Sequence, residues 1–151
     1  MVFSSFLFTE ASKFSIVPLN GLFMLTRYPD DIGLMEDMLK TSNELKELTD
    51  KVINLVTKEF QVDEIILFGS YAKGTATDLS DVDVLVISPQ FKEGVAILEN
   101  VFTIKEKTGL REPYLQLFAF PSKIYYNEEL FIDPDFIREI KRTGKVLYSS
   151  L

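Results

Sequence analysis

The sequence predicts an α+β fold, in which a mixed β-sheet with one core is flanked by helices. Apolar residues recur at helical spacing between residues 42 and 60, which is typical of an amphipathic helix. Short apolar runs of the buried-strand type follow at 64–68 and 82–87, and helical and strand patterns alternate after them. Hydrophobic residues make up 46% of the 151 residues, which is enough for a core of this kind.

The first helix is expected over residues 42–60. Thr41 and Glu44 have the spacing of a capping box, although a start nearer Asp31 also fits the pattern. Lys and Glu fill the face opposite the apolar positions. Those apolar positions are Leu45, Leu48, Val52, Leu55, Val56 and Phe60.

Strand and helix patterns then alternate to the end of the chain. Gly109 and Gly144 each follow a helical pattern, as glycines at helix C-termini commonly do. Phe102 and Phe118 are expected in the core, because large aromatic side chains are usually buried. In chain order, we expect strands at 64–68 and 82–87, a helix at 91–108, a strand at 114–120, a helix at 135–143 and an edge strand at 146–148.

Residues 1–34 differ from the rest and are interpreted as an N-terminal extension to a domain that covers residues 35–151. They have no regular period, and Pro18-Leu19-Asn20-Gly21 is typical of a turn. The apolar start, MVFSSFLFT, is too short to span a membrane and lacks the features of a secretory signal, so we expect a cytoplasmic protein. Because an exposed MVFSSFLF stretch would be unusual for a monomer, one hypothesis is an interface in a homo-oligomer.

Charge and composition exclude several kinds of site. The net charge of -7 argues against a long nucleic acid as partner, because such binding needs a basic face. The chain has no Cys and no His, which excludes disulfides, zinc clusters, thiol nucleophiles and Ser-His triads. Any metal must therefore be held by oxygen ligands, which favours magnesium, calcium or manganese.

The chemistry is expected around two aspartates. Asp81 and Asp83 stand two apart at the start of a strand, so alternation puts both carboxylates on one face and turns Val82 and Val84 towards the core. Adjacent carboxylates raise each other's pKa unless a cation neutralises them. Magnesium typically uses one or two carboxylates together with substrate phosphates, so this pair is a candidate metal site.

Gly69-Ser70 ends the preceding strand and is a candidate phosphate-binding corner. Glycine permits close approach of the backbone, and exposed N–H groups and the serine hydroxyl can hold phosphate oxygens. Phosphate donors and a metal-binding pair on neighbouring strands favour phosphoryl or nucleotidyl transfer. For the aspartates taken alone, two solvated loop residues are the alternative.

The segment from Leu67 to Val86 resembles the DNA polymerase beta-like nucleotidyltransferase superfamily in its minimal form. That pattern is Gly-Ser, three residues, Gly, a short loop and Ser-Asp-x-Asp before an apolar strand, and the residues that match it are Gly69, Ser70, Gly74, Ser80, Asp81 and Asp83. The resemblance implies the nucleotidyltransferase fold, with two catalytic aspartates that bind Mg²⁺. It also implies a nucleoside triphosphate held by Gly69, Ser70 and Ser80. Lys73 is expected either to add charge near the phosphates or to be a solvated loop lysine.

Enzymes of this family usually carry a third carboxylate on a later strand, where it completes the metal site and assists deprotonation of the attacking hydroxyl. The strand expected in this place has Gln116 at its centre, and an amide cannot act as a base. Glu112 lies on the same side by alternation but further out along the chain. Two interpretations stay open: Glu112 is a displaced third ligand, or the site has no third carboxylate.

A second resemblance concerns Leu25-Thr26-Arg27-Tyr28-Pro29-Asp30, which is similar to a segment near the last helix of HEPN domains. HEPN proteins are often encoded beside minimal nucleotidyltransferases in toxin–antitoxin pairs. The HEPN nuclease motif requires a His that this chain lacks, so the segment is either a HEPN remnant or a surface turn.

The family resemblance implies an enzyme that moves a nucleoside monophosphate from a nucleoside triphosphate, with ATP favoured, to an acceptor hydroxyl. That acceptor could belong to a HEPN toxin, which would make the protein the antitoxin of the pair. The alternative is a binding module that has lost catalysis and neutralises a HEPN partner by forming a complex with it.

Overall fold

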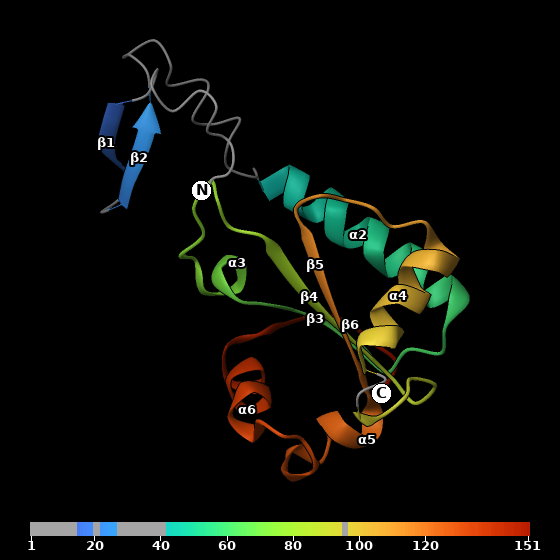
Figure 1. Ribbon diagram of the computed structural model, residues 1–151. Helices are drawn as coiled ribbons and strands as arrows, with labels where there is room; N and C mark the ends of the chain where they lie inside the picture. Colours follow the sequence, from blue (N-terminus) through green and yellow to red (C-terminus); the bar gives the residue numbers. More distant parts are fainter. Residues whose placement is uncertain (1–14, 20–21, 27–41, 95–96) are drawn as a thin grey trace. The chain divides into compact units, whose positions relative to one another are not determined.

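The computed structural model describes residues 15–19, 22–26, 42–94 and 97–151 (Figure 1). The chain divides into two compact units, of which the first comprises Met1–Glu47 with Ala76–Ser80 and the second Leu48–Thr75 with Asp81–Leu151. In the part of the chain that is described, no helix is both long enough and apolar enough to cross a bilayer.

The first unit contains a two-stranded antiparallel hairpin of β1 (Ser15–Leu19) and β2 (Leu22–Thr26), with Leu19 opposite Leu22. Only a turn was expected in this region, so both strands are additions to the predicted elements. Several predictions concern residues outside the described ranges: the MVFSSFLFT interface, the turn at 20–21, the capping residue Thr41 and the Arg27–Asp30 part of the HEPN-like segment.

The second unit is built on a four-stranded mixed sheet with the strand order β5-β4-β3-β6. Strand β4 runs antiparallel to β3 and parallel to β5, while β6 runs antiparallel to β3 at the edge. The mixed sheet and its edge strand confirm the predicted fold class. The strands are β3 (Glu64–Phe68), β4 (Val82–Ser88), β5 (Leu115–Pro121) and β6 (Lys145–Ser149).

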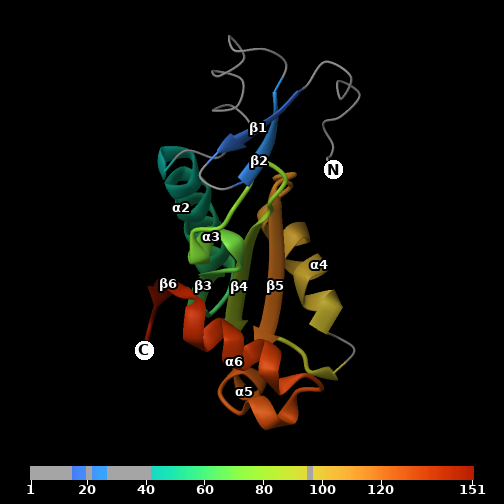
Figure 2. The ribbon, with the colours of Figure 1, turned by 90° about the vertical axis from the view of Figure 1, so that its left-hand side faces the viewer.

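Helices cover both faces of this sheet (Figures 1 and 2). Helices α2 and α4 lie on one face, and α5 and α6 lie on the other, where Ile137 and Ile140 join a buried cluster with Phe68 and Leu85. The described helices are α2 (Ser42–Glu59), α3 (Ser70–Lys73), α4 (Ile97–Thr108), α5 (Ser122–Tyr125), the 3-10 turn η4 (Glu128–Leu130) and α6 (Pro134–Thr143).

Strand β4 is buried on both faces except at Asp83. Val82 and Val84 are fully buried on the side of α2 and α4, as alternation predicted, while Leu85 and Ile87 belong to the cluster beneath α5 and α6. Burial of each such side chain stabilises the fold by about 1.5–3 kcal/mol. Asp83 is the half-buried exception in this strand.

Two predictions along α4 are wrong. The α-helix is described from Ile97, and residues 91–94, which were expected in it, are not α-helical. The buried Asn100 side chain binds the backbone of this segment. Its Oδ1 accepts the Lys92 N–H at 2.9 Å, and its Nδ2 donates to the Lys92 carbonyl at 2.8 Å. Phe102 is 65% exposed on this helix and is no core residue, whereas Phe118 packs against the core as expected.

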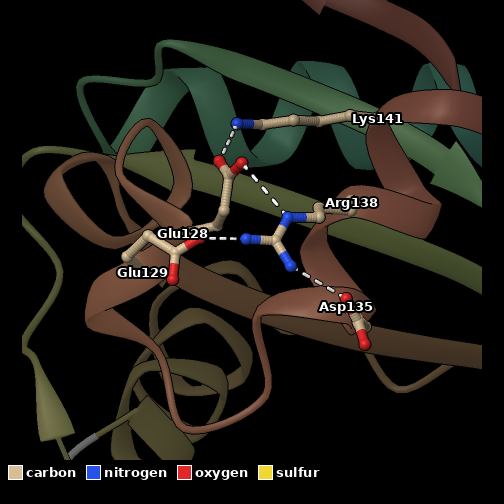
Figure 3. Close-up of polar contacts among 5 residues, drawn as sticks. All are labelled: Glu128, Glu129, Asp135, Arg138 and Lys141. Atoms are coloured by element: carbon tan, nitrogen blue, oxygen red, sulfur yellow. Dashed lines mark hydrogen bonds and ion pairs between the residues drawn. The ribbon is translucent and has the colours of Figure 1, made fainter.

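Helix α6 is fixed at both ends. Arg138 pairs with Asp135 in the first turn at 2.8 Å and with Glu128 and Glu129 of η4, and Lys141 in the last turn pairs with Glu128 at 2.5 Å (Figure 3). At its end, a Cβ at position 144 would lie 2.6 Å from the Ile140 carbonyl oxygen and 2.7 Å from Cγ2 of Ile66, so only glycine fits between α6 and β3. These contacts place α6 against the same sheet face as Asp83.

Candidate functional site

Asp83 lies at the start of β4, between two neighbouring strands. It is in register with Phe68, the last residue of β3, on one side and with Gln116 of β5 on the other. Alternation puts its side chain on the same face as Leu85 and Ile87, which pack beneath α5 and α6. Asp83 is therefore the polar end of an otherwise apolar row.

Gly69 brings the end of β3 directly against the Asp83 carboxylate. Its backbone has φ 75° and ψ -154°, a region that essentially only glycine adopts. A Cβ built on Gly69 would overlap Oδ2 of Asp83 and lie 3.2 Å from its Cγ. The backbone of the glycine-serine corner therefore lies directly against the Asp83 carboxylate. The side chain of any larger residue at position 69 would collide with that carboxylate.

The short helix α3 follows this corner at once. The Gly69 carbonyl accepts the N–H groups of Ala72 and Lys73, each at 3.1 Å, and the Ser70 carbonyl accepts the Thr75 N–H at 2.9 Å. Ala72 is buried, which anchors the turn to the sheet. Sequence reasoning missed α3, because four residues are too few to show a period.

The two aspartates act on each other electrostatically. Asp81 is exposed and Asp83 is half-buried. Burial, and to a lesser extent the nearby charge of Asp81, raises the pKa of Asp83 to about 6. A divalent cation between the two carboxylates would remove that cost, and paired carboxylate oxygens are ligands that Mg²⁺ accepts. The residues present therefore fit a magnesium ion.

The position beside Asp83 on β5 is held by an amide. Gln116 is exposed and pairs with Asp83 in the parallel register. Glu112 lies before β5, and its Oε2 is 2.5 Å from Nζ of Lys51 on α2. Among the residues that the structure describes, no group of three or more acidic side chains is placed to hold a metal ion. A role for Glu112 as a displaced ligand stays a prediction.

Lys73 and Ser80 have partners of their own. Lys73 Nζ lies 3.0 Å from Oε2 of Glu139 on α6. Ser80 Oγ accepts the Thr77 N–H at 2.8 Å, and this bond shapes the loop that leads into β4. Their expected roles at the phosphates stay predictions.

Three aromatic rings form a cluster beside Asp83. Phe68 packs edge-on against Phe118 at 5.1 Å and against Phe136 of α6 at 5.9 Å between ring centroids. Phe118 stands two residues beyond Gln116, on the same strand face. Sequence reasoning missed the part that α6 plays here, because periodicity identified the helix but not the end of the sheet that it reaches.

The chain is similar in sequence to a known protein family. Residues 49–146 match the model of the nucleotidyltransferase domain family. A provisionally named protein adenylyltransferase of Methanocaldococcus jannaschii is 32% identical over 99 residues, which are 58% of this chain and 99% of that protein. A second such protein of the same organism is 33% identical over 110 residues, which are 70% of this chain and 99% of the relative.

Among solved structures, a provisionally assigned nucleotidyltransferase from Sulfolobus solfataricus aligns with a TM-score of 0.49 at 16% identity, over 82% of this chain and 90% of that one. A chain from the complex of a tri-AMPylated Shewanella oneidensis HEPN toxin with an MNT antitoxin aligns with a TM-score of 0.42 at 17% identity, over 70% and 72% of the two chains.

The family match spans the sheet strands β3, β4 and β5, the glycine-serine corner and both aspartates, and the two sequence relatives are covered over nearly their whole length. This chain therefore belongs to the nucleotidyltransferase domain family.

Proposed function

We propose that this nucleotidyltransferase moves adenosine monophosphate from ATP to an acceptor hydroxyl and uses Mg²⁺. One observation carries the proposal: the Asp83 carboxylate lies so close to the backbone of residue 69 that only glycine fits at that position. A triphosphate seated on the corner would therefore lie beside the acidic pair. The provisional name of the sequence relatives, protein adenylyltransferase, supports ATP as donor and a protein as acceptor.

In this proposal Asp81 and Asp83 hold the magnesium ion. When bound, the ion supplies neutralisation of the charge that develops on the phosphates. Gly69 and Ser70 bind the triphosphate through backbone N–H groups and the hydroxyl, and Ser80 is a further candidate ligand of the triphosphate. Burial of Asp83 and, second, the charge of Asp81 raise the pKa of the Asp83 carboxyl group, and a bound cation would offset both effects.

The transfer exchanges one bond for another. The acceptor oxygen bonds to the α-phosphorus as the bond from that phosphorus to the β-phosphate oxygen breaks, and pyrophosphate leaves. Gln116 cannot take the acceptor proton, so the proton passes to water or to a carboxylate. Glu112 would serve only after it separates from Lys51, to which it is now bound.

The acceptor that we propose is a side chain of a HEPN partner, which would make the chain an antitoxin. This step rests on the family resemblance of the Gly69 to Asp83 motif. A reaction that consumes ATP also favours the cytoplasm as its location. Self-association through residues 1–34 is a separate proposal, which the oligomeric state with and without that segment would test.

One observation favours a second candidate function. Gln116 stands beside Asp83 in the register, where an acid would complete the metal site. In this alternative the chain neutralises its HEPN partner by binding alone, without nucleotidyl transfer.

A labelling experiment separates the two. The chain is incubated with ATP labelled at the α-phosphate, Mg²⁺ and any HEPN protein that is encoded beside it. We expect label on the partner, and loss of that label in the Asp81→Asn/Asp83→Asn double variant. The matched control is Glu129→Gln/Asp135→Asn, which removes the same charge from the cluster around Arg138 (Figure 3). Complex formation without label in the wild type would overturn the transfer proposal and favour the binding module.

A further inference from the structure

We propose that Glu139 of α6 is a positioning residue that holds Lys73 beside the glycine-serine corner and releases it to the triphosphate when the nucleotide binds. The inference rests on the proposed function, because it names a control on the same site. It assigns a role to a residue far along the chain that no motif contains.

The first support is the place of Lys73. It stands three residues after Ser70 on α3, so the two side chains lie on the same face of that turn. The ion pair to Oε2 of Glu139, at 3.0 Å, holds the lysine to α6. Both side chains are 42% exposed, which leaves the ammonium group accessible to a ligand.

The second support is the face of α6 that carries Glu139. Phe136 lies three residues earlier, one helical turn away, and packs on Phe68 at the end of β3. Phe68 is the register partner of Asp83. The face of α6 that holds Lys73 is therefore the face that packs at the end of β3 beside Asp83.

The third support is that Glu139 keeps a cationic partner when Lys73 moves to the triphosphate. Glu139 also accepts a hydrogen bond from Nη2 of Arg142 at 2.5 Å, and Arg142 and Lys73 together lower the pKa of Glu139. When Lys73 moves, Arg142 remains as the counter-ion. An exposed ion pair of this kind is weak, whereas an ammonium group makes strong charge-assisted hydrogen bonds to phosphate.

The direction in which Glu139→Gln changes nucleotide affinity distinguishes two roles of the ion pair. If Glu139 competes with the phosphates for Lys73, then Glu139→Gln frees the lysine and tightens nucleotide binding. If the pair only held α3 against α6, its loss would loosen the corner and weaken nucleotide binding instead.

The experiment is a double-variant cycle on nucleotide affinity. Calorimetry measures the binding of a non-transferable ATP analogue, with a methylene group between the α- and β-phosphates, in the presence of Mg²⁺. The variants are Glu139→Gln, Lys73→Gln and the two combined, and Asp135→Asn on the same helix controls for the change in net charge. Thermal melting of each variant confirms that it is folded.

We expect Glu139→Gln to tighten binding by about three- to fivefold, the scale of an exposed ion pair, and Lys73→Gln to weaken it by at least as much. In the Lys73→Gln background, Glu139→Gln should have no further effect. An equal effect in both backgrounds, or weaker binding in Glu139→Gln, would overturn the inference. If the wild type binds no magnesium nucleotide, the proposed function itself fails, so the two failures are distinguishable.

Discussion

The Asp83 carboxylate occupies the space that a side chain at position 69 would fill. Asp83 lies on β4, and Gly69 follows directly after Phe68, the last residue of the antiparallel strand β3 and the register partner of Asp83. This contact joins the candidate phosphate corner to the candidate metal ligands, so changes at either residue should affect both stability and nucleotide binding.

Gly69→Ala should lower both the folding stability and the nucleotide affinity of the protein. The new Cβ collides with Asp83, and alanine is strained in the backbone conformation of Gly69, which together cost about 1–3 kcal/mol of folding stability. Nucleotide affinity should fall by at least about tenfold, because the carboxylate must move. Urea unfolding and calorimetry measure the two effects.

Gly109→Ala is the control for strain alone. Gly109 also has positive φ, at 76°, but a Cβ there meets nothing within 4 Å. The Gly109→Ala variant should therefore lose folding stability and keep its nucleotide affinity. If Gly69→Ala also loses stability but keeps its nucleotide affinity, the contact between residue 69 and Asp83 does not contribute to nucleotide binding.

Asp83→Asn should stabilise the nucleotide-free protein while it abolishes transfer. The pKa of Asp83 is about 6 in the folded protein against a usual 3.8, so the folded state binds its proton more tightly than the unfolded state. That contribution is complete below pH 3.8 and is lost as the pH rises through 6. At pH 8 the variant should gain on the order of 1 kcal/mol after solvent screening.

The readout is the free energy of unfolding between pH 4 and pH 8, without metal. The wild type should lose stability relative to Asp83→Asn as the pH rises through 6, and added Mg²⁺ should restore it. A constant difference in the free energy of unfolding between the two proteins across this range would show that the pKa of Asp83 is not raised in the folded protein.

Gln116→Glu should place a third carboxylate beside Asp83. The parallel register puts the two residues side by side, so the new charge should tighten Mg²⁺ or Mn²⁺ binding, by about tenfold if it adds one ligand. Gln116→Leu, which adds no ligand, is the comparison. Metal titration in the absence of nucleotide measures the effect, and equal affinities in the two variants would count against a metal beside Asp83.

Glu112→Gln should leave transfer nearly unchanged. The Glu112 carboxylate is bound to Lys51, and an exposed pair of this kind stabilises the fold by about 0.2–1 kcal/mol. Lys51→Gln breaks the same pair and serves as the matched variant. A loss of label transfer by about a hundredfold or more in Glu112→Gln alone would instead identify Glu112 as the displaced third ligand.

Much of the site follows from local sequence rules. The strand pattern around Val82 and Val84 required Asp81 and Asp83 to project away from those buried valines, and the structure buries both valines. The edge strand and α6 followed equally from periodicity and from Gly144. The comparisons confirm the family that the Gly69 to Asp83 motif indicated.

The rest depends on contacts between distant residues, which a single pattern does not contain. The pairs Lys73–Glu139 and Lys51–Glu112 join segments more than sixty residues apart. The Asn100 side chain binds the backbone of Lys92 in the segment before α4, and Phe102 is exposed although its chemistry favours burial. The β1–β2 hairpin was missed although Asn20-Gly21 is a strong hairpin signal, because the flanking residues do not alternate between apolar and polar.

The central claim is that the corner at Gly69-Ser70 and the pair Asp81 and Asp83 form one site for a magnesium nucleotide. Calorimetric titration with the non-transferable ATP analogue, with and without Mg²⁺, tests it most directly. We expect binding that requires Mg²⁺ and that falls by at least about tenfold in Asp81→Asn/Asp83→Asn but not in Glu129→Gln/Asp135→Asn. Equal affinity in the wild type and the aspartate double variant would contradict it.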